Sequence, residues 1–182
     1  IEREWDVLGL NGPIDYRLQR LAGLDSYLIP NGPATTAKMR AAFFRLTDHS
    51  VDDAHKVPSE TLSVQGRALL VPKALRGAAV FSFKRLCMSP LGAADYLAIA
   101  QRYHTVFLVG VPQMSAAMRN EAKRFATLID ALYEHKVKLF IAADAPPEAL
   151  YREGDGAFEF ARTASRLVEM QSAAYLALGH GC

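Results

Sequence analysis

The sequence predicts an α/β fold, in which helices cover a mostly parallel sheet and a small hairpin is inserted. Two apolar runs, at residues 105–111 and 137–142, have the length and composition of buried strands. A helical pattern follows each run, at residues 115–134 and at residues 157–178. The order strand, helix, strand, helix favours parallel strands joined by covering helices.

The helix predicted for residues 115–134 has the clearest pattern of the chain. Ser115 is a residue type that often caps the first turn of a helix. Apolar residues then recur at helical spacing and predict one buried face: Met118, Ala122, Phe125, Ile129 and Leu132. In residues 146–148, two prolines and an acid predict the start of a further short helix.

The earlier part of the chain contains shorter predicted elements. Extended segments are predicted at residues 7–10, 26–29 and 80–83, and helices at residues 35–46 and 93–103. Residues 61–71 alternate around Gly66 and predict a hairpin. Residues 47–60 are polar and irregular, so they are predicted to form a flexible loop within one α/β portion that spans residues 1–182.

Composition limits the classes of function. The chain of 182 residues is 51% hydrophobic and 22% charged, which is typical of a globular protein with a buried core. Its net charge of +2 does not favour nucleic acid as a partner, and no apolar run is long enough to span a membrane. With only Cys87 and Cys182, a reducing, cytoplasmic location is the simplest expectation.

A phosphate loop of the form Gly-x-x-x-x-Gly-Lys-Ser/Thr is absent from the sequence. The nearest string, GPATTAK at residues 32–38, lacks the second glycine and the Gly-Lys pair. The backbone amides and the lysine that neutralise phosphates are therefore missing, and we do not expect this chain alone to hold ATP. No metal site is predicted either: His104 and His135 lack partners at ligand spacing, and a loop interpretation accounts for His49, His55, Asp48, Asp52 and Asp53.

A polar stripe along residues 158–172 allows two interpretations. Glu159, Arg162, Arg166 and Glu169 fall on one side of a helix, where they can form surface pairs facing water. Alternatively, Arg162 or Arg166 points at a phosphate, because the fixed donor fork of a guanidinium suits phosphate recognition.

Several segments together resemble a known family. They are IDYR at residues 14–17, PLGAADYLAIAQRYHTVFL at 90–108, RNEAKRFATLIDALYE at 119–134, APPEALY at 145–151 and FEFARTASRLVEMQSAAYL at 158–176. In this order they resemble the C-terminal half of ZapE-type ATPases, which are AAA+ P-loop proteins linked to bacterial cell division, with mitochondrial AFG-like relatives. The resemblance runs from about residue 5 to residue 181.

The resemblance implies an ATP-hydrolysing protein that uses ATP and Mg²⁺ in its full-length form. Because the chain starts at Ile1 without a phosphate loop, we expect the nucleotide-binding half to lie upstream. The expected partners are that upstream half, further copies in a homo-oligomer, or a cell-division protein. The residues expected to act at the nucleotide are Arg162 and Arg166 as sensors, and Arg119 and Arg124 at a subunit boundary. The alternative is a non-catalytic α/β interaction module; an unrelated small hydrolase has only unassembled Ser and His residues in its favour.

Overall fold

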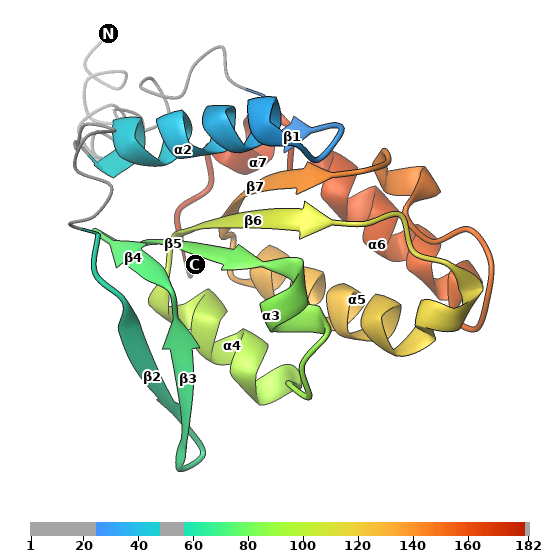
Figure 1. Ribbon diagram of the computed structural model, residues 1–182, viewed down its shortest axis with the longest axis horizontal. Coiled ribbons are helices and arrows are strands. Elements are labelled where there is room, and N and C mark those ends of the chain that lie inside the picture. Colours follow the sequence, from blue (N-terminus) through green and yellow to red (C-terminus); the bar gives the residue numbers. More distant parts are fainter. Residues whose placement is uncertain (1–24, 48–56, 181–182) are drawn as a thin grey trace, which may run out of the picture.

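The computed structural model describes residues 25–47 and 57–180, and its core is a five-stranded sheet between two layers of helices (Figure 1). The strands lie in the order β1 (Tyr27–Leu28), β7 (Lys138–Ala143), β6 (Thr105–Val111), β5 (Ala78–Ser82) and β4 (Lys73–Leu75). Neighbouring strands are parallel except β4, which pairs antiparallel with β5. The predicted α/β class with a mostly parallel sheet is confirmed.

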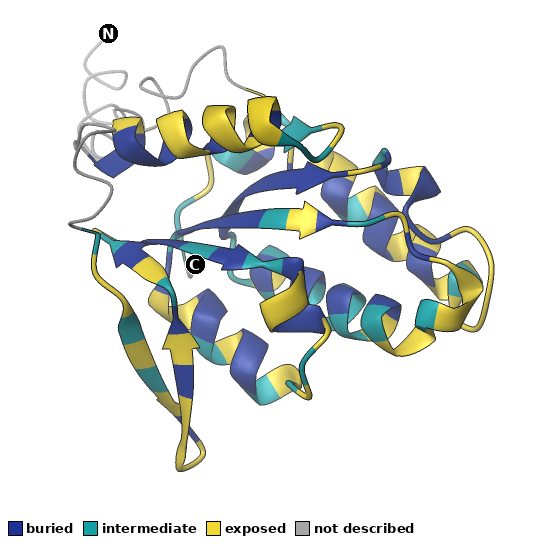
Figure 2. Ribbon diagram, in the orientation of Figure 1, coloured by how far each residue is buried: buried dark blue, intermediate teal, exposed yellow. Residues whose placement is uncertain are grey.

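The central strands are buried on both faces, which explains their unbroken apolar sequences. Every residue of β7 is buried, and the first four residues of β6 are buried as well (Figure 2). A strand that contacts helices on both sides is apolar at nearly every position, whereas a half-exposed strand alternates. The buried polar exceptions here, Thr105 and Lys138, are the first residues of β6 and β7.

Helix α2 (Pro33–Thr47) covers one face of the sheet, as Figure 1 shows. Its Phe43 packs edge-on against Phe107 of β6 with ring centroids 5.5 Å apart. Phe107 in turn stacks on Phe140 of β7 at 4.8 Å. These rings join helix, strand and strand into one small apolar cluster.

A larger helical layer covers the opposite face. It contains α3 (Phe83–Cys87), α4 (Ala93–Arg102) and α5 (Arg119–Glu134), and α6 (Ala157–Glu169) packs against α5 (Figure 1). Short 3-10 turns precede α5 at Ala116–Met118 and lie between β7 and α6 at Pro147–Ala149. The buried face of α5 consists of the predicted Ala122, Phe125, Ile129 and Leu132, together with Leu128.

The predicted hairpin is confirmed as β2 (Glu60–Val64) and β3 (Arg67–Val71), which form a separate two-stranded sheet. Its two-residue turn has positive φ at both Gln65 (51°) and Gly66 (81°), the combination that matches the twist of paired strands.

Some elements differ from the predictions. The helix predicted for residues 157–178 is interrupted after Glu169, and a short helix, α7 (Ala173–Leu176), follows. The interruption has a local cause, because the side chain of Ser172 accepts a hydrogen bond from the backbone of Tyr175 and starts the new helix. The predicted extended segment at residues 80–83 ends one residue early, because Ser82 caps α3 by accepting a hydrogen bond from the backbone of Arg85.

Two predictions fall largely outside the described residues. The extended segment at residues 7–10 and most of the loop predicted at residues 47–60 belong to this group. Within the described part of the chain, no helix is both long and apolar enough to cross a membrane.

Candidate functional site

All four arginines predicted to act at a nucleotide lie on the helical layer formed by α5 and α6. Arg119 and Arg124 belong to the first half of α5, and Arg162 and Arg166 belong to α6. The two helices pack against each other, yet the four side chains have different surroundings. Their contacts within the chain show which guanidinium groups remain available to bind another molecule.

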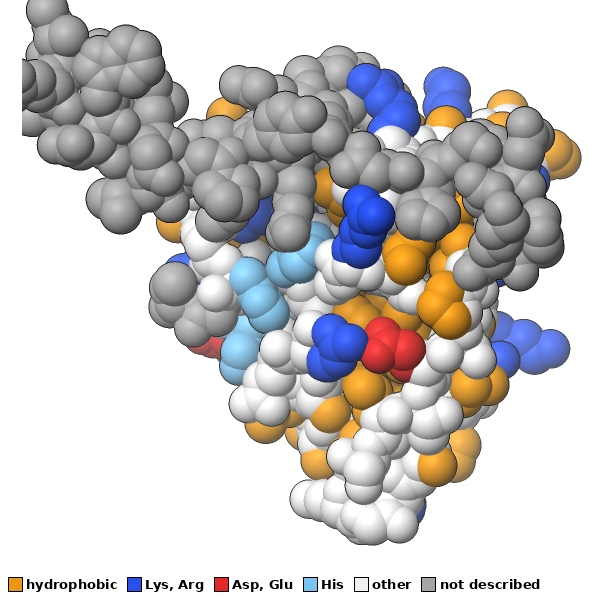
Figure 3. Space-filling view, turned by 90° about the vertical axis from the view of Figure 1, so that its left-hand side faces the viewer, with side chains coloured by type: hydrophobic (Ala, Val, Ile, Leu, Met, Phe, Trp, Pro, Cys, Tyr) orange, Lys and Arg blue, Asp and Glu red, His pale blue; other side chains and the backbone are white. Residues whose placement is uncertain are grey.

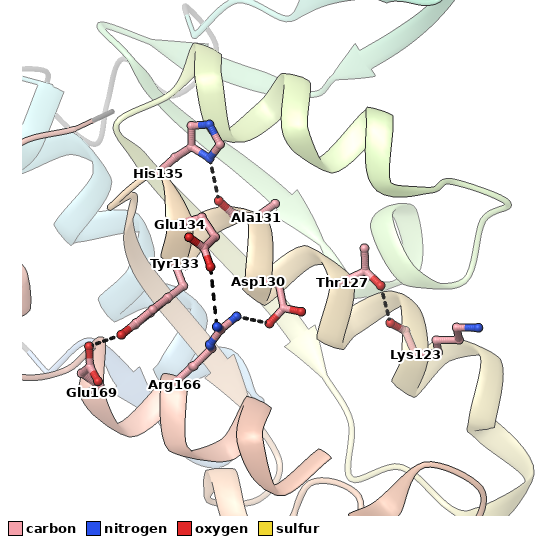
Figure 4. Close-up of polar contacts among 9 residues, drawn as sticks. All are labelled: Lys123, Thr127, Asp130, Ala131, Tyr133, Glu134, His135, Arg166 and Glu169. Atoms are coloured by element: carbon pink, nitrogen blue, oxygen red, sulfur yellow. Dashed lines mark hydrogen bonds and ion pairs between the residues drawn. The ribbon is translucent and has the colours of Figure 1, made fainter. Parts of the chain in front are cut away.

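Arg166 lies between the two helices and is held by α5 (Figure 4). Its guanidinium forms an ion pair with Asp130, lies 3.6 Å from a carboxylate oxygen of Glu134, and stacks 4.6 Å from the ring centre of Tyr133. Only 16% of the side chain is exposed. Two carboxylates therefore already balance its charge.

The partner of Glu169 also comes from α5. Its carboxylate accepts a hydrogen bond from the hydroxyl of Tyr133, and this bond raises the pKa of Tyr133 (Figure 4). Arg166 and Glu169 thus each bind α5 instead of forming the surface pair that their spacing on α6 allows. The polar stripe predicted from spacing is in part a contact between helices.

Arg124 and Arg119 also make contacts within the chain. Arg124 donates a hydrogen bond of 3.1 Å to the carbonyl of Cys87, at the end of α3, where a cation also interacts favourably with the helix dipole. Arg119 pairs with Asp155 at 3.0 Å, but both side chains are mostly exposed, at 63% and 79%. An exposed pair of this kind contributes little to stability and opens easily.

Arg162 differs from the other three arginines. Its side chain is exposed and forms no hydrogen bond or ion pair with another described residue. Phe158, one helical turn earlier on the same side of α6, is 90% exposed. An arginine and an aromatic ring therefore point away from the protein together.

A pocket of about 460 Å³ lies between the first turns of α5 and α6. Arg119 and Lys123 line it on the α5 side, and Asp155 and Glu159 line it on the α6 side. Charges of both signs thus face the pocket, while Arg124, Arg162 and Arg166 lie outside its lining. The structure does not gather the four arginines into one anion-binding pocket.

The strand, turn and helix order typical of a phosphate loop is present at β1, residues 29–32 and α2. The turn does not fit a triphosphate, because Pro30 and Pro33 have no backbone N–H and the N–H of Asn31 donates to Asp144 at 3.1 Å. A phosphate cradle needs several free backbone amides in succession. The described residues at this turn therefore do not fit ATP with Mg²⁺. Asn31 and Asp144 are 113 positions apart, so no sequence spacing indicates that they are partners.

Histidine side chains gather on the face of the molecule shown in Figure 3. The ring nitrogens of His104, His135 and His180 lie within hydrogen-bond distance of backbone carbonyls, at 2.9, 3.1 and 2.7 Å. Among the described residues no group of three or more His, Cys, Asp or Glu is placed to hold a metal ion. His49, His55 and the neighbouring aspartates lie outside the described residues.

Comparison with known proteins gives consistent relatives. The chain is 34% identical to the cell division protein ZapE of Escherichia coli K12 over 180 residues, which cover 99% of the chain and 47% of that protein. It is 36% identical over 152 residues to an uncharacterized protein of Schizosaccharomyces pombe, covering 83% of the chain and 33% of that protein. It is 34% identical over 165 residues to lactation elevated protein 1 homolog B of Danio rerio, covering 90% of the chain and 32% of that protein.

The chain thus spans less than half of the length of each of these relatives. No solved structure matches it. The sequence profile of the AFG1-like ATPases matches residues 1–178, nearly the whole chain. The chain therefore belongs to the AFG1-like ATPase family.

Proposed function

We propose that this chain is part of an ATP-hydrolysing protein in which ATP and Mg²⁺ are held outside the described residues. Family membership supports ATP hydrolysis. The β1–α2 turn supports the location of ATP and Mg²⁺ outside the described residues, because its two prolines and its bonded amide leave no cradle for phosphates.

The role proposed for this chain is to supply an arginine to that nucleotide. Arg162 suits this role best, because its guanidinium is exposed and has no partner among the described residues. Arg166 suits it less, because an incoming phosphate would have to compete with Asp130 and Glu134. Arg119 remains a candidate at a subunit boundary, since its exposed pair with Asp155 costs little to open.

The setting proposed for this activity follows from the relatives. ZapE of Escherichia coli is a cell division protein by name, so we propose a role linked to cell division, in the cytoplasm. The partner that holds the nucleotide would be the upstream half implied by the resemblance, or another copy of the protein in a homo-oligomer.

ATP turnover tests the arginine assignment, measured on the chain expressed together with the upstream half that the resemblance implies. Arg162→Ala is expected to lower turnover at least about tenfold, since an arginine that meets the transferred phosphoryl group is worth orders of magnitude in rate. Its melting temperature should change little, because Arg162 is exposed and forms no hydrogen bond or ion pair with another described residue.

Arg166→Ala is the matched comparison from the same helix. It removes the ion pair with Asp130 and the stacking on Tyr133, so its first effect should be a lower melting temperature. Undiminished turnover in Arg162→Ala would contradict the arginine role of that residue. Undiminished turnover in both variants would remove α6 from the catalytic machinery altogether.

A second candidate function is a non-catalytic interaction module, which the exposure of Phe158 favours. A phenylalanine that is 90% exposed beside an arginine resembles the anchor residues of protein interfaces. Titration of the chain with nucleotide can exclude one of the two candidate functions. Micromolar binding would exclude an interaction module that has no nucleotide role. Loss of turnover in Arg162→Ala, with normal melting, would exclude it as well.

A further inference from the structure

The parallel strands of this sheet follow the arrangement of a nucleotide-binding sheet. Their order is β1, β7, β6 and β5. The chain leaves β1 through α2 on one face, and it leaves β5, β6 and β7 towards α3, α4, α5 and α6 on the other (Figure 1). Connections from the adjacent strands β1 and β7 thus run to opposite faces, which defines the switch point where open α/β sheets bind ligands.

One residue of the β1–α2 turn, Asn31, forms hydrogen bonds at the ends of both β6 and β7. The side-chain amide of Asn31 donates to the carbonyl of Val111, at the end of β6, at 2.8 Å. Its backbone N–H donates to a carboxylate oxygen of Asp144, just after β7, at 3.1 Å. These two hydrogen bonds, named here the Asn31 bridge, join the β1–α2 turn to the ends of β6 and β7.

The first turn of α2 closes on itself in the same region. Thr35 is 7% exposed, and its hydroxyl donates to the carbonyl of Pro30 at 2.6 Å. This hydrogen bond closes the turn, so the side chains of Asn31 and Thr35 are both bonded within the chain.

The end of β6 is shaped to receive the Asn31 bridge. The pairing of β6 with β7 shifts register between Leu108 and Val111, and Gly110 has a φ of 76°, a conformation that a glycine adopts without strain. The Val111 carbonyl accepts the bond from Asn31 and a second one, of 3.0 Å, from the backbone of Asp144. Both acceptor positions of this carbonyl are therefore used.

We propose that the carboxyl edge of this sheet is a closed crevice, a nucleotide-type site in which the Asn31 bridge stands where a ligand would bind. The chain then has the topology of a nucleotide-binding unit while its crevice serves only to fix α2 on the sheet. This proposal depends on contacts within the described residues and does not require the proposed ATPase activity. A failed turnover experiment would leave it standing.

Hydrogen exchange of the chain, followed by mass spectrometry on peptides that cover residues 30–36, tests the closed crevice. In the native chain these amides should exchange slowly, and MgATP at about millimolar concentration should leave their rates unchanged. Asn31→Ala removes the side-chain donor to Val111, so exchange in these peptides should rise about fivefold or more. Asn120→Ala, an exposed asparagine on α5, is the matched control and should not change them.

Asn31→Asp is a second variant with a stronger expected effect. It places a carboxylate against the Val111 carbonyl and near Asp144, so exchange should rise at least as much as in Asn31→Ala. Slower exchange of the native turn on addition of MgATP would overturn the proposal, because it would show a ligand in the crevice. Unchanged exchange in both Asn31 variants would also overturn it, because the bridge would then not hold the turn.

Discussion

The two ends of the central sheet each hold a distant segment of the chain, but by different chemistry. At the carboxyl end, the Asn31 bridge holds the β1–α2 turn with two hydrogen bonds at a partly exposed residue. At the amino end of β7, Lys138 holds the last described residues by donating to the carbonyls of Tyr175 and Leu178, at 3.2 and 2.6 Å.

Burial is the main difference between these ends. Lys138 is 8% exposed, and Tyr175 is 3% exposed with a hydroxyl that donates to Val137 at 2.8 Å. A buried aromatic ring contributes much more free energy than a hydrogen bond that water can replace. Contacts at the amino end of the sheet should therefore contribute more to the free energy of unfolding. Contacts at the carboxyl end mainly fix the position of the β1–α2 turn.

The largest effect is expected from Tyr175→Ala at the amino end. The change removes a buried ring that stacks on Tyr133 at 5.8 Å, together with the hydroxyl donor to Val137. We expect the free energy of unfolding to fall by about 3–5 kcal/mol, measured by denaturant titration. Leu178→Ala, an exposed neighbour, is the control, and an equal loss there would contradict the central role of the ring.

The second largest effect is expected from the pH dependence of stability, which arises from Lys138 at the amino end of the sheet. Burial, helped by nearby Lys136, lowers the pKa of Lys138 to about 8 from its usual 10.5. As pH rises from about 8 to 10, the folded chain loses this proton while the unfolded chain keeps it. The unfolded state then binds more protons at this residue, so the contribution of Lys138 to the free energy of unfolding should rise with pH, by on the order of 1–2 kcal/mol up to pH 9.5.

Lys138→Met provides the reference for this measurement. Urea titrations at pH 7.5 and pH 9.5 should show the native chain gaining stability relative to the variant. A constant difference between the two proteins would show that Lys138 does not titrate in this window. Burial raises the pKa of the Cys87 thiol above its usual 9.0, which lowers stability in this window in both proteins, so the contribution of Lys138 is taken from the difference between them. The raised pKa of Tyr175 acts in the same direction above about pH 10.

The smallest effect is expected from Asn31→Ala at the carboxyl end. The variant loses one neutral hydrogen bond at a partly exposed turn, so the free energy of unfolding should fall by about 1 kcal/mol. Asn120→Ala, tested in the same way, should be within about 0.5 kcal/mol of the native chain. A loss as large as that of Tyr175→Ala would remove the contrast between the two ends.

The sequence predicts best those elements whose pattern arises from burial. Residues 105–111 and the face of α5 around Phe125 follow this rule, and both agree with the structure. β4 and α3 were not predicted, because elements of three and five residues are too short to show a period. Ser82 and Ser172 cap the first turns of α3 and α7, and hydrophobic periodicity does not reveal where these two short helices begin.

The candidate site was less predictable than the fold. Helical spacing placed Arg166 beside Glu169, but its partner Asp130 is 36 positions away and is brought close only by the packing of α6 on α5. The string at residues 32–38 indicated a turn before a helix, but could not show that Asn31 meets Val111 and Asp144. Such pairs depend on which strands become neighbours, and one sequence alone does not give that order. The roles of Arg119, Arg124, Arg162 and Arg166 at a nucleotide stay predictions.

The position of β1 in the sheet also has a consequence for the order of folding. β5, β6 and β7 are joined by single crossovers, whereas the bond from Asn31 to Asp144 joins residues 113 positions apart. Closing a longer loop costs more chain entropy and occurs later on average. We therefore expect β5, β6 and β7 to assemble first, with α2 and the Asn31 bridge among the last native contacts to form and the first to open.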